Sequence, residues 1–151
     1  IHQPNYSMLN RWVENGLLDT CGEFGLGIIA FCPLFQGLLT DKYLKGIPDG
    51  SRASLENSPL RKNEVNEQNI KVIQELNEHA GQRGQTLAQM ALSWVLRDDR
   101  VTSALVGASS AFQILENIKS AKQTEFSADE LSKLDKILAK ANLPKSLWSS
   151  E

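Results

Sequence analysis

Short apolar runs alternate with longer segments of helical spacing along this chain. Two of the runs have the length of a buried strand, residues 27–31 and residues 102–106, and residues 1–5 have the pattern of the last residues of another. Strands that are apolar throughout and separated by helices are typical of a parallel sheet covered on both faces. The pattern therefore predicts three parallel strands in an α/β fold.

Apolar residues three and four positions apart predict the helices between these strands. The first helical segment is broken at Gly16, and Gly81 marks the end of a later one. Thr86 is the expected N-cap of the next helix, and Ser127 with Glu130 forms a capping box. The expected helical segments are residues 6–15, 17–24, 65–80, 87–95, 110–119 and about 128–141.

A long segment without sustained periodicity separates the second strand from the next helix. It covers residues 34–63 and carries Gly37, Gly46, Pro48, Gly50 and Pro59. Loops of this length within a compact domain are usually functional. We therefore expect this loop to contribute to a binding site.

The composition is that of one globular domain, which we assign to residues 1–151: 41% of the residues are hydrophobic and 23% are charged. A formal net charge of -2 and the lack of a basic stripe argue against nucleic-acid binding. The longest apolar runs, such as residues 27–34, are far shorter than the ~20 residues that cross a bilayer. We therefore expect a soluble protein with no membrane insertion.

The two cysteines, Cys21 and Cys32, match no metal-binding or redox spacing. Two thiols without a disulfide framework fit a reducing compartment. We expect both to be packing residues in a cytoplasmic protein without a metal site.

The junction at residues 106–110 has the chemistry of an anion site. Gly107 lets a ligand approach the backbone, and the first amides of a helix that opens with Ser109 have no partners inside that helix. Gln113, Glu116 and Asn117 follow at helical spacing, so they share a face that could hold the ribose of a nucleotide. The alternative is an ordinary surface helix with a solvated polar face.

Several short motifs occur together in this chain at fixed spacings. They are Gln3-Pro4-Asn5-Tyr6-Ser7, residues 32–40, Lys42-Tyr43, Ser51-Arg52, and residues 106–109 with Glu116-Asn117. Together they resemble the C-terminal part of the aldo-keto reductases, (β/α)8 TIM barrels that reduce carbonyls with NADPH. Within that family the sequence is most similar to the bacterial L-glyceraldehyde 3-phosphate reductases and the potassium-channel β subunits. The resemblance implies about three of the eight β/α units, an incomplete barrel.

The resemblance also implies a role for residues at the nicotinamide and pyrophosphate end of the cofactor. Gln3 would hydrogen-bond the carboxamide, and Tyr6 would stack on the nicotinamide ring. Lys42 and Arg52 would bind phosphates, Arg52 with a planar fork. Main-chain groups would wrap the ribose and pyrophosphate at Phe31, Cys32, Pro33, Leu34, Phe35, Gln36 and Gly37. Without the resemblance, Gln3 reads as a strand-end polar residue, Tyr6 as a core tyrosine, and the two cations as surface charges.

The adenosine end of the cofactor would lie at the later junction. The resemblance assigns the 2'-phosphate, ribose and adenine to Gly107, Ser109, Gln113, Glu116 and Asn117, in keeping with the phosphate sites that barrels build after their last strands.

Three departures from the family pattern qualify these roles. Gly50 stands where channel-type relatives tend to carry an aromatic, and Gln113 is neutral where many members carry an arginine, so NADPH selectivity would rest more on Lys42 and Ser109. The catalytic Asp, Tyr, Lys and His of the family come from earlier strands. His2 and His79 do not match the catalytic position, so we assign no catalytic residue in this chain.

The resulting hypothesis is the cofactor-binding part of an NADP(H)-dependent reductase of small aldehydes or ketones, such as L-glyceraldehyde 3-phosphate or methylglyoxal, and inactive alone. Two alternatives are a nucleotide-binding accessory subunit of a membrane channel and a non-catalytic truncated fragment. Exposed sheet edges near Ile28, Ile29, Leu105 and Val106 lead us to expect self-association.

Overall fold

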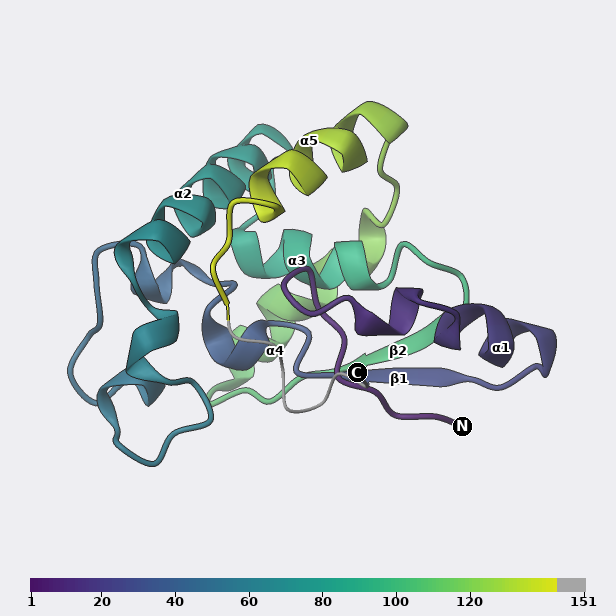
Figure 1. The fold of residues 1–151 in the computed structure, drawn as a ribbon, viewed down its shortest axis with the longest axis horizontal. Coiled ribbons are helices and arrows are strands. Elements are labelled where there is room, and N and C mark those ends of the chain that lie inside the picture. The colour runs from purple at the N-terminus through teal and green to yellow at the C-terminus, as the bar shows by residue number, and fades with distance from the viewer. Residues whose placement is uncertain (144–151) are drawn as a thin grey trace.

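A two-stranded parallel sheet lies toward the lower right of the molecule in the view of Figure 1. The structure is a computed structural model, and it describes residues 1–143. Strand β1 (Ile28–Phe31) pairs in parallel with β2 (Val101–Leu105). Residues 1–5 run along the other side of β1 through isolated parallel bridges, His2 to Ile28 and Asn5 to Phe31. Two of the three predicted parallel strands are thus confirmed, whereas residues 1–5 run parallel to β1 through isolated bridges and do not form a regular strand.

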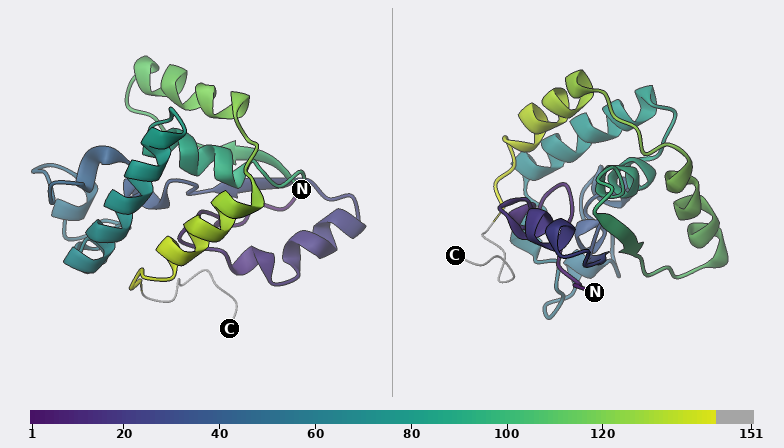
Figure 2. Two further views of the ribbon diagram at one scale, coloured as in Figure 1. Left: turned by 90° about the horizontal axis from the view of Figure 1, so that it is seen from above. Right: turned by 90° about the vertical axis from the view of Figure 1, so that its right-hand side faces the viewer.

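Residues 1–143 also contain five α-helices, of which α3 packs against β2. They are α1 (Leu17–Glu23), α2 (Glu67–Gln82), α3 (Leu87–Val95), α4 (Ala111–Ile118) and α5 (Ala128–Leu138). Helix α3 is the central one, since it contacts α2, α4 and β2, and eight of its nine residues are buried. Helix α2 also packs against α5, and Figure 2 shows this pair on one side of α3 with α4 on another.

The predicted N-cap at Thr86 and the predicted capping box at Ser127 are both confirmed, and Thr86 also forms a capping box with Gln89. The Thr86 hydroxyl accepts a hydrogen bond from the Gln89 amide at 3.2 Å, and the Gln89 side chain accepts one from the Thr86 amide at 3.0 Å. Ser127 and Glu130 make the same reciprocal pair at the start of α5. Each pair satisfies two amides that the first turn of a helix leaves without partners.

The predicted helix over residues 6–15 is wrong in its first half. Ser7 and Asn10 face each other in an antiparallel bridge, and the Ser7 hydroxyl also accepts a hydrogen bond from the Asn10 amide at 3.1 Å. A side chain that bonds the nearby backbone in this way competes with helix formation. Only a short 3-10 turn, Trp12–Glu14, follows before α1.

Several helix ends also differ from the expectation by one to three residues. Helix α2 passes through Gly81 and ends at Gln82, and α5 ends at Leu138 and not near residue 141. Helix α4 begins at Ala111 with Ser110 as its N-cap, so Ser109 precedes the helix. The Ser110 hydroxyl fixes this boundary, because it accepts a hydrogen bond from the Gln113 amide at 3.3 Å.

The long loop contains no α-helix and is nevertheless well packed. It makes short 3-10 turns at Phe35–Gly37, Asp41–Tyr43, Arg52–Ser54 and Lys62–Glu64. Apolar side chains in and between these turns are fully buried, among them Leu38, Leu39, Tyr43 and Leu60. The loop therefore belongs to the hydrophobic core and can hold its polar residues in place.

The described part of the chain has neither a membrane-spanning helix nor a metal-binding cluster. None of its helices is both long and apolar enough to cross a membrane. Residues 1–143 also contain no group of three or more His, Cys, Asp or Glu side chains placed to hold a metal ion.

The turn between α3 and β2 carries an ion pair that generates a pH-dependent prediction. Arg100 donates to both carboxylate oxygens of Asp98, at 2.7 and 2.6 Å, and these hydrogen bonds hold the pKa of Asp98 below its ordinary value. A carboxyl with a lowered folded-state pKa stabilises the protein above its unfolded pKa, and this contribution is lost as the pH falls through the folded value.

We expect Asp98→Asn to lower the free energy of unfolding at pH 7 by about 1 kcal/mol, a modest value because the pair is partly exposed to solvent. The difference from the wild type should shrink as the pH falls below ~4, because the carboxyl is then protonated first in the unfolded state and, at still lower pH, in the folded state. Urea denaturation at several pH values measures both. The neighbouring Asp99→Asn is the control, and equal effects of the two substitutions at pH 7 would contradict this account.

Candidate functional site

The sheet brings three loops to one edge. Asn5 pairs with Phe31, and Phe31 pairs with Leu105, so these three residues lie in one row across residues 1–5, β1 and β2. Residues 1–5, β1 and β2 run in the same direction. The segments that follow them, residues 6–7, 32–37 and 106–110, therefore all leave the sheet at its carboxyl edge. Ligands of parallel α/β folds bind at this edge. The structure thus brings the two predicted phosphate-binding segments to the same end of the sheet.

The segment after β1 has an unusual backbone. Cys32, Phe35 and Gln36 have φ values of 54°, 46° and 57°, the left-handed region that side chains other than glycine rarely adopt. Each such residue costs on the order of 1 kcal/mol or more, and such residues cluster at ligand-binding sites. Strain in three of five consecutive residues marks residues 32–36 as a candidate binding segment.

A chain of side-chain hydrogen bonds spans this strained segment. The Arg52 guanidinium donates from Nη1 to Gln36 Oε1 at 2.8 Å, and Gln36 Nε2 donates to Cys32 Sγ at 2.8 Å. Burial raises the pKa of the Cys32 thiol more than the nearby positive charge of Arg52 lowers it. The thiol is therefore neutral at pH 7 and serves as a hydrogen-bond acceptor, not as a nucleophile.

The predicted anion site before α4 is solvent-exposed and built from neutral donors. The Ser109 amide and hydroxyl both donate to Gln113 Oε1, at 2.8 and 3.1 Å. Nothing lies within 4 Å of where a Cβ on Gly107 would point. No packing contact within residues 1–143 therefore requires a glycine there, whereas a ligand approaching the backbone would.

Glu116 and Asn117 lie one turn further along α4 and are both half-buried. The Glu116 carboxylate accepts hydrogen bonds from Gln89 at 3.2 Å and from Lys119 at 2.5 Å. These bonds fix Glu116 against α3. The structure therefore holds Glu116 at a defined distance from the exposed Gln113 on the same helix.

The two predicted nicotinamide contacts differ in exposure. Gln3 is exposed, whereas Tyr6 is fully buried. The Tyr6 hydroxyl donates to Glu14 at 2.7 Å and accepts from Arg97 at 3.1 Å, and its ring centroid lies 5.5 Å from that of Trp94. This is the position of a core tyrosine, the alternative that its residue type alone suggested.

Phe31 is the aromatic residue at the carboxyl end of β1, and its side chain is half-buried. A ring at this edge is better placed than Tyr6 for stacking on a planar ligand. From the resemblance, Phe31 was expected to contribute only main-chain groups. Its place as the last residue of a predicted strand was the signal that could have indicated more.

Lys42 lies on the surface of the long loop. Its amide donates to Thr40 Oγ1 at 3.3 Å, and within residues 1–143 its ammonium makes no hydrogen bond or ion pair. The structure thus connects Arg52, through Gln36, to the strained segment and does not connect Lys42 to it.

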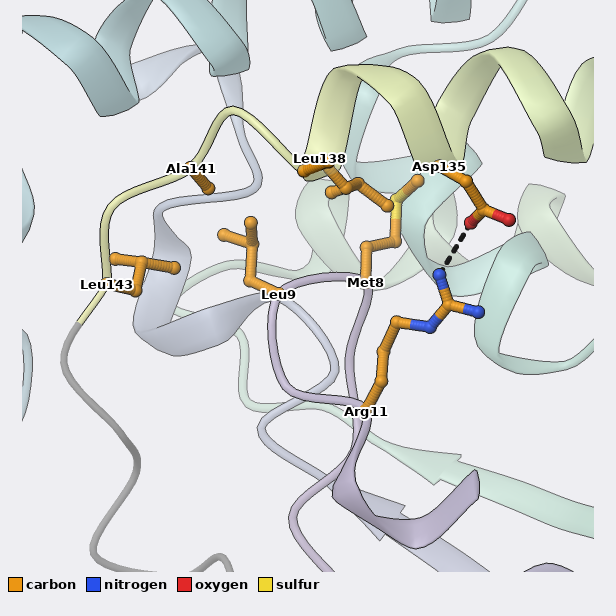
Figure 3. A pocket seen from close by; sticks show the side chains of 8 residues that line it. Met8, Leu9, Arg11, Asp135, Leu138, Ala141 and Leu143 are labelled. Carbon is orange, nitrogen blue, oxygen red and sulfur yellow. Dashed lines mark hydrogen bonds and ion pairs between the residues drawn. The ribbon is translucent and has the colours of Figure 1, made fainter. Parts of the chain in front are cut away.

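A groove of about 420 Å³ lies apart from these residues (Figure 3). An ion pair between Arg11 and Asp135, 2.6 Å apart, lies at one end of it. Its lining is Met8, Leu9, Arg11, Asp135, Leu138, Ala139, Ala141 and Leu143. None of the predicted cofactor residues is among them, so this groove is not the candidate site.

Comparison with known proteins places the chain in a family. The family model described as aldo/keto reductase family matches residues 1–139. The chain therefore belongs to the aldo-keto reductases, as the motifs indicated. A solved structure, an aldo-keto reductase from Klebsiella pneumoniae in complex with NADPH, resembles 99% of the chain with a TM-score of 0.62 at 24% identity. The predicted fold class, part of a (β/α)8 barrel, is confirmed.

Curated relatives of two kinds match as well. The chain is 51% identical over 154 aligned residues to L-glyceraldehyde 3-phosphate reductase of Escherichia coli strain K12, an alignment that covers 99% of the chain. It is 36% identical over 122 residues to a probable voltage-gated potassium channel subunit beta of Oryza sativa, across 79% of the chain. The alignments cover 44% and 37% of these relatives, and 42% of the solved structure. The chain thus spans less than half the length of each.

The buried position of Tyr6 leads to a prediction that separates packing from binding. Tyr6→Phe removes a hydroxyl that bridges Glu14 and Arg97, so we expect a loss of about 1–2 kcal/mol in the free energy of unfolding. We expect no change in the affinity for NADPH. Tyr43→Phe is the matched variant, since its hydroxyl accepts a single 3.4 Å bond from Ala53 and should cost less. Weaker NADPH binding by Tyr6→Phe at unchanged stability would contradict the packing role.

Proposed function

We propose that this chain forms the dinucleotide-binding part of an NADP(H)-dependent aldo-keto reductase. The proposal rests chiefly on one arrangement, the strained segment 32–36 that holds Arg52 at the same sheet edge as Ser109. Membership of the family supports it, and so does the NADPH bound to the Klebsiella pneumoniae protein. We assign the cofactor contacts to the residues that the motifs single out, with Phe31 in place of Tyr6 at the nicotinamide ring.

The available donors fit the phosphates of a dinucleotide. Arg52 is exposed and uses one of its N–H groups on Gln36, so the rest of its planar fork is open to a pyrophosphate oxygen. The Ser109 amide and hydroxyl already converge on the oxygen of Gln113, and a 2'-phosphate oxygen would be a stronger acceptor for the same donors. Lys42 would add positive charge at longer range.

The nicotinamide end would lie at the first two strand ends. Gln3 offers an amide that can both donate to and accept from a carboxamide, and Phe31 offers a ring face. Bound NADPH would supply the hydride for carbonyl reduction. In this scheme the chain orients the ring and contributes no acid or base. We assign proton transfer to the family's catalytic Asp, Tyr, Lys and His, none of which we match to a residue of this chain.

Small aldehydes and ketones are the proposed substrates of the longer protein to which such a part belongs. L-glyceraldehyde 3-phosphate is the first choice because of the 51% identity to the Escherichia coli reductase, and methylglyoxal is a simple test substrate. Cytoplasmic location and self-association remain predictions. The identity to channel β subunits supports one alternative, a nucleotide-binding accessory subunit, and a catalytically inactive fragment is the other.

The role of Arg52 can be tested by cofactor titration. We expect Arg52→Ala to weaken NADPH binding about tenfold or more, because a charged hydrogen bond contributes about 1.5–3 kcal/mol, and Arg52→Lys to recover only part of this. NADPH fluorescence or calorimetry provides the dissociation constants. Arg61→Ala, at an exposed arginine of the same loop, is the control. Unchanged binding by Arg52→Ala would remove Arg52 from the site.

Catalysis can be tested by combining mass with turnover. For a purified chain of 16.7 kDa by intact mass, we expect no oxidation of NADPH with methylglyoxal, although NADPH binds. Turnover by a chain of this mass would show that the acid and base residues lie within it. Absence of NADPH binding would instead favour the inactive fragment.

A further inference from the structure

Gln36 is the only residue that joins the strained segment to Arg52 through side chains in the described part of the chain. Its amide spans a thiol four positions before it and a guanidinium sixteen positions after it. These two bonds use one acceptor and one donor of the amide. The contact therefore crosses from the end of β1 to a different turn of the long loop.

The orientation of this amide follows from the chemistry of its partners. A guanidinium has only donors, so the atom that faces Arg52 must be the oxygen. The NH2 group then faces the Cys32 sulfur, a weak acceptor whose proton is retained because burial raises the pKa of the thiol. The order Cys32, Gln36, Arg52 thus has one self-consistent set of hydrogen bonds.

The backbone of Gln36 adds a second observation. Its φ of 57° follows a φ of 46° at Phe35, and Gly37 comes next with a φ of 96°. Glycine would adopt such a conformation at residue 36 without strain, so the presence of a side chain there costs stability. The hydrogen bonds to Cys32 and Arg52 offset part of this cost, and they also restrict Arg52, which is otherwise a flexible surface side chain.

We infer that Gln36 is a positioning residue: it holds the Arg52 guanidinium in the orientation that receives a phosphate of the dinucleotide. The inference rests on the proposed function. In this arrangement Gln36 does not itself bind the cofactor through its side chain. It reduces the rotamer freedom that Arg52 must lose on binding, so its contribution to affinity is transmitted through Arg52.

A double-mutant cycle tests this coupling. Gln36→Met keeps the length and backbone preference of the side chain but removes both hydrogen bonds. We expect it to weaken NADPH binding about fivefold in the wild-type background and to have no effect in the Arg52→Ala background. Gln36→Glu should weaken binding more than Gln36→Met, because the carboxylate neutralises Arg52 while keeping the contact.

The alternatives give different results. Equal losses on Gln36→Met in both backgrounds would overturn the inference and assign Gln36 a direct cofactor contact or a general loop role. Tighter binding by Gln36→Met would also overturn it, because Gln36 would then compete with the phosphate for Arg52. If the wild-type chain does not bind NADPH at all, the proposed function fails together with the inference.

A measurement without cofactor supplies independent evidence for the positioning step. We expect 15N relaxation of the Arg52 Nε–Hε group to show a more mobile side chain in Gln36→Met than in the wild type. Gln36→Gly, which relaxes the backbone and also lacks the amide, should show the same increase. Equal mobility in all three proteins would overturn the inference even if NADPH binds to each.

Discussion

Parallel pairing in fixed register is the constraint on which the site depends. Asn5, Phe31 and Leu105 lie side by side, so three segments far apart in sequence leave the sheet at one edge. A shift by one residue would turn the side chains of a strand to its opposite face. Ile28 and Ala30, both fully buried, oppose such a shift, since it would bring them out of the core. The hydrophobic pattern of β1 therefore also fixes where the strained segment begins.

The strain at residues 32–36 persists because the residues that follow are packed firmly. Leu38, Leu39 and Tyr43 of the same loop are buried, and the Tyr43 hydroxyl accepts a hydrogen bond from the Ala53 amide. Ala53 is itself buried and adjoins Arg52. The core thus anchors the backbone of Arg52 while Gln36 holds its side chain. Stability gained from apolar burial in the loop offsets the unfavourable conformations next to the sheet.

Local signals made much of this fold predictable from the sequence. The N-cap at Thr86, the capping box at Ser127 and the apolar runs of β1 and β2 each depend on residues a few positions apart, and each was confirmed. The turn at residues 7–10 was missed because apolar spacing outweighed the hydrogen bonding of Ser7. The N-cap was placed one residue early because Ser109 and Ser110 are both good caps. Only the structure shows that the Ser110 hydroxyl accepts from Gln113.

The site was less predictable than the fold, because its contacts join residues distant in sequence. The motifs singled out Gln36 and Arg52 separately, and no pattern in the sequence indicates that one holds the other. Tyr6 illustrates a second difficulty. A motif residue next to the first strand end was assigned to the ligand, but Glu14, Trp94 and Arg97 enclose it. Arg97 lies 91 positions from Tyr6, so residue type and motif could not reveal this environment.

Exposed apolar side chains on α4 bear on how this site would work in a longer protein. Phe112 and Leu115 are 69% and 63% exposed, and β2 ends at Leu105, which is 52% exposed. These side chains adjoin the segment that carries Ser109 and Gln113. Covering them with protein would lower the local dielectric and strengthen hydrogen bonds to a phosphate there. In the proposed site, phosphate binding by Arg52 would depend mainly on contacts within the long loop, whereas phosphate binding by Ser109 would depend more on what packs against α4.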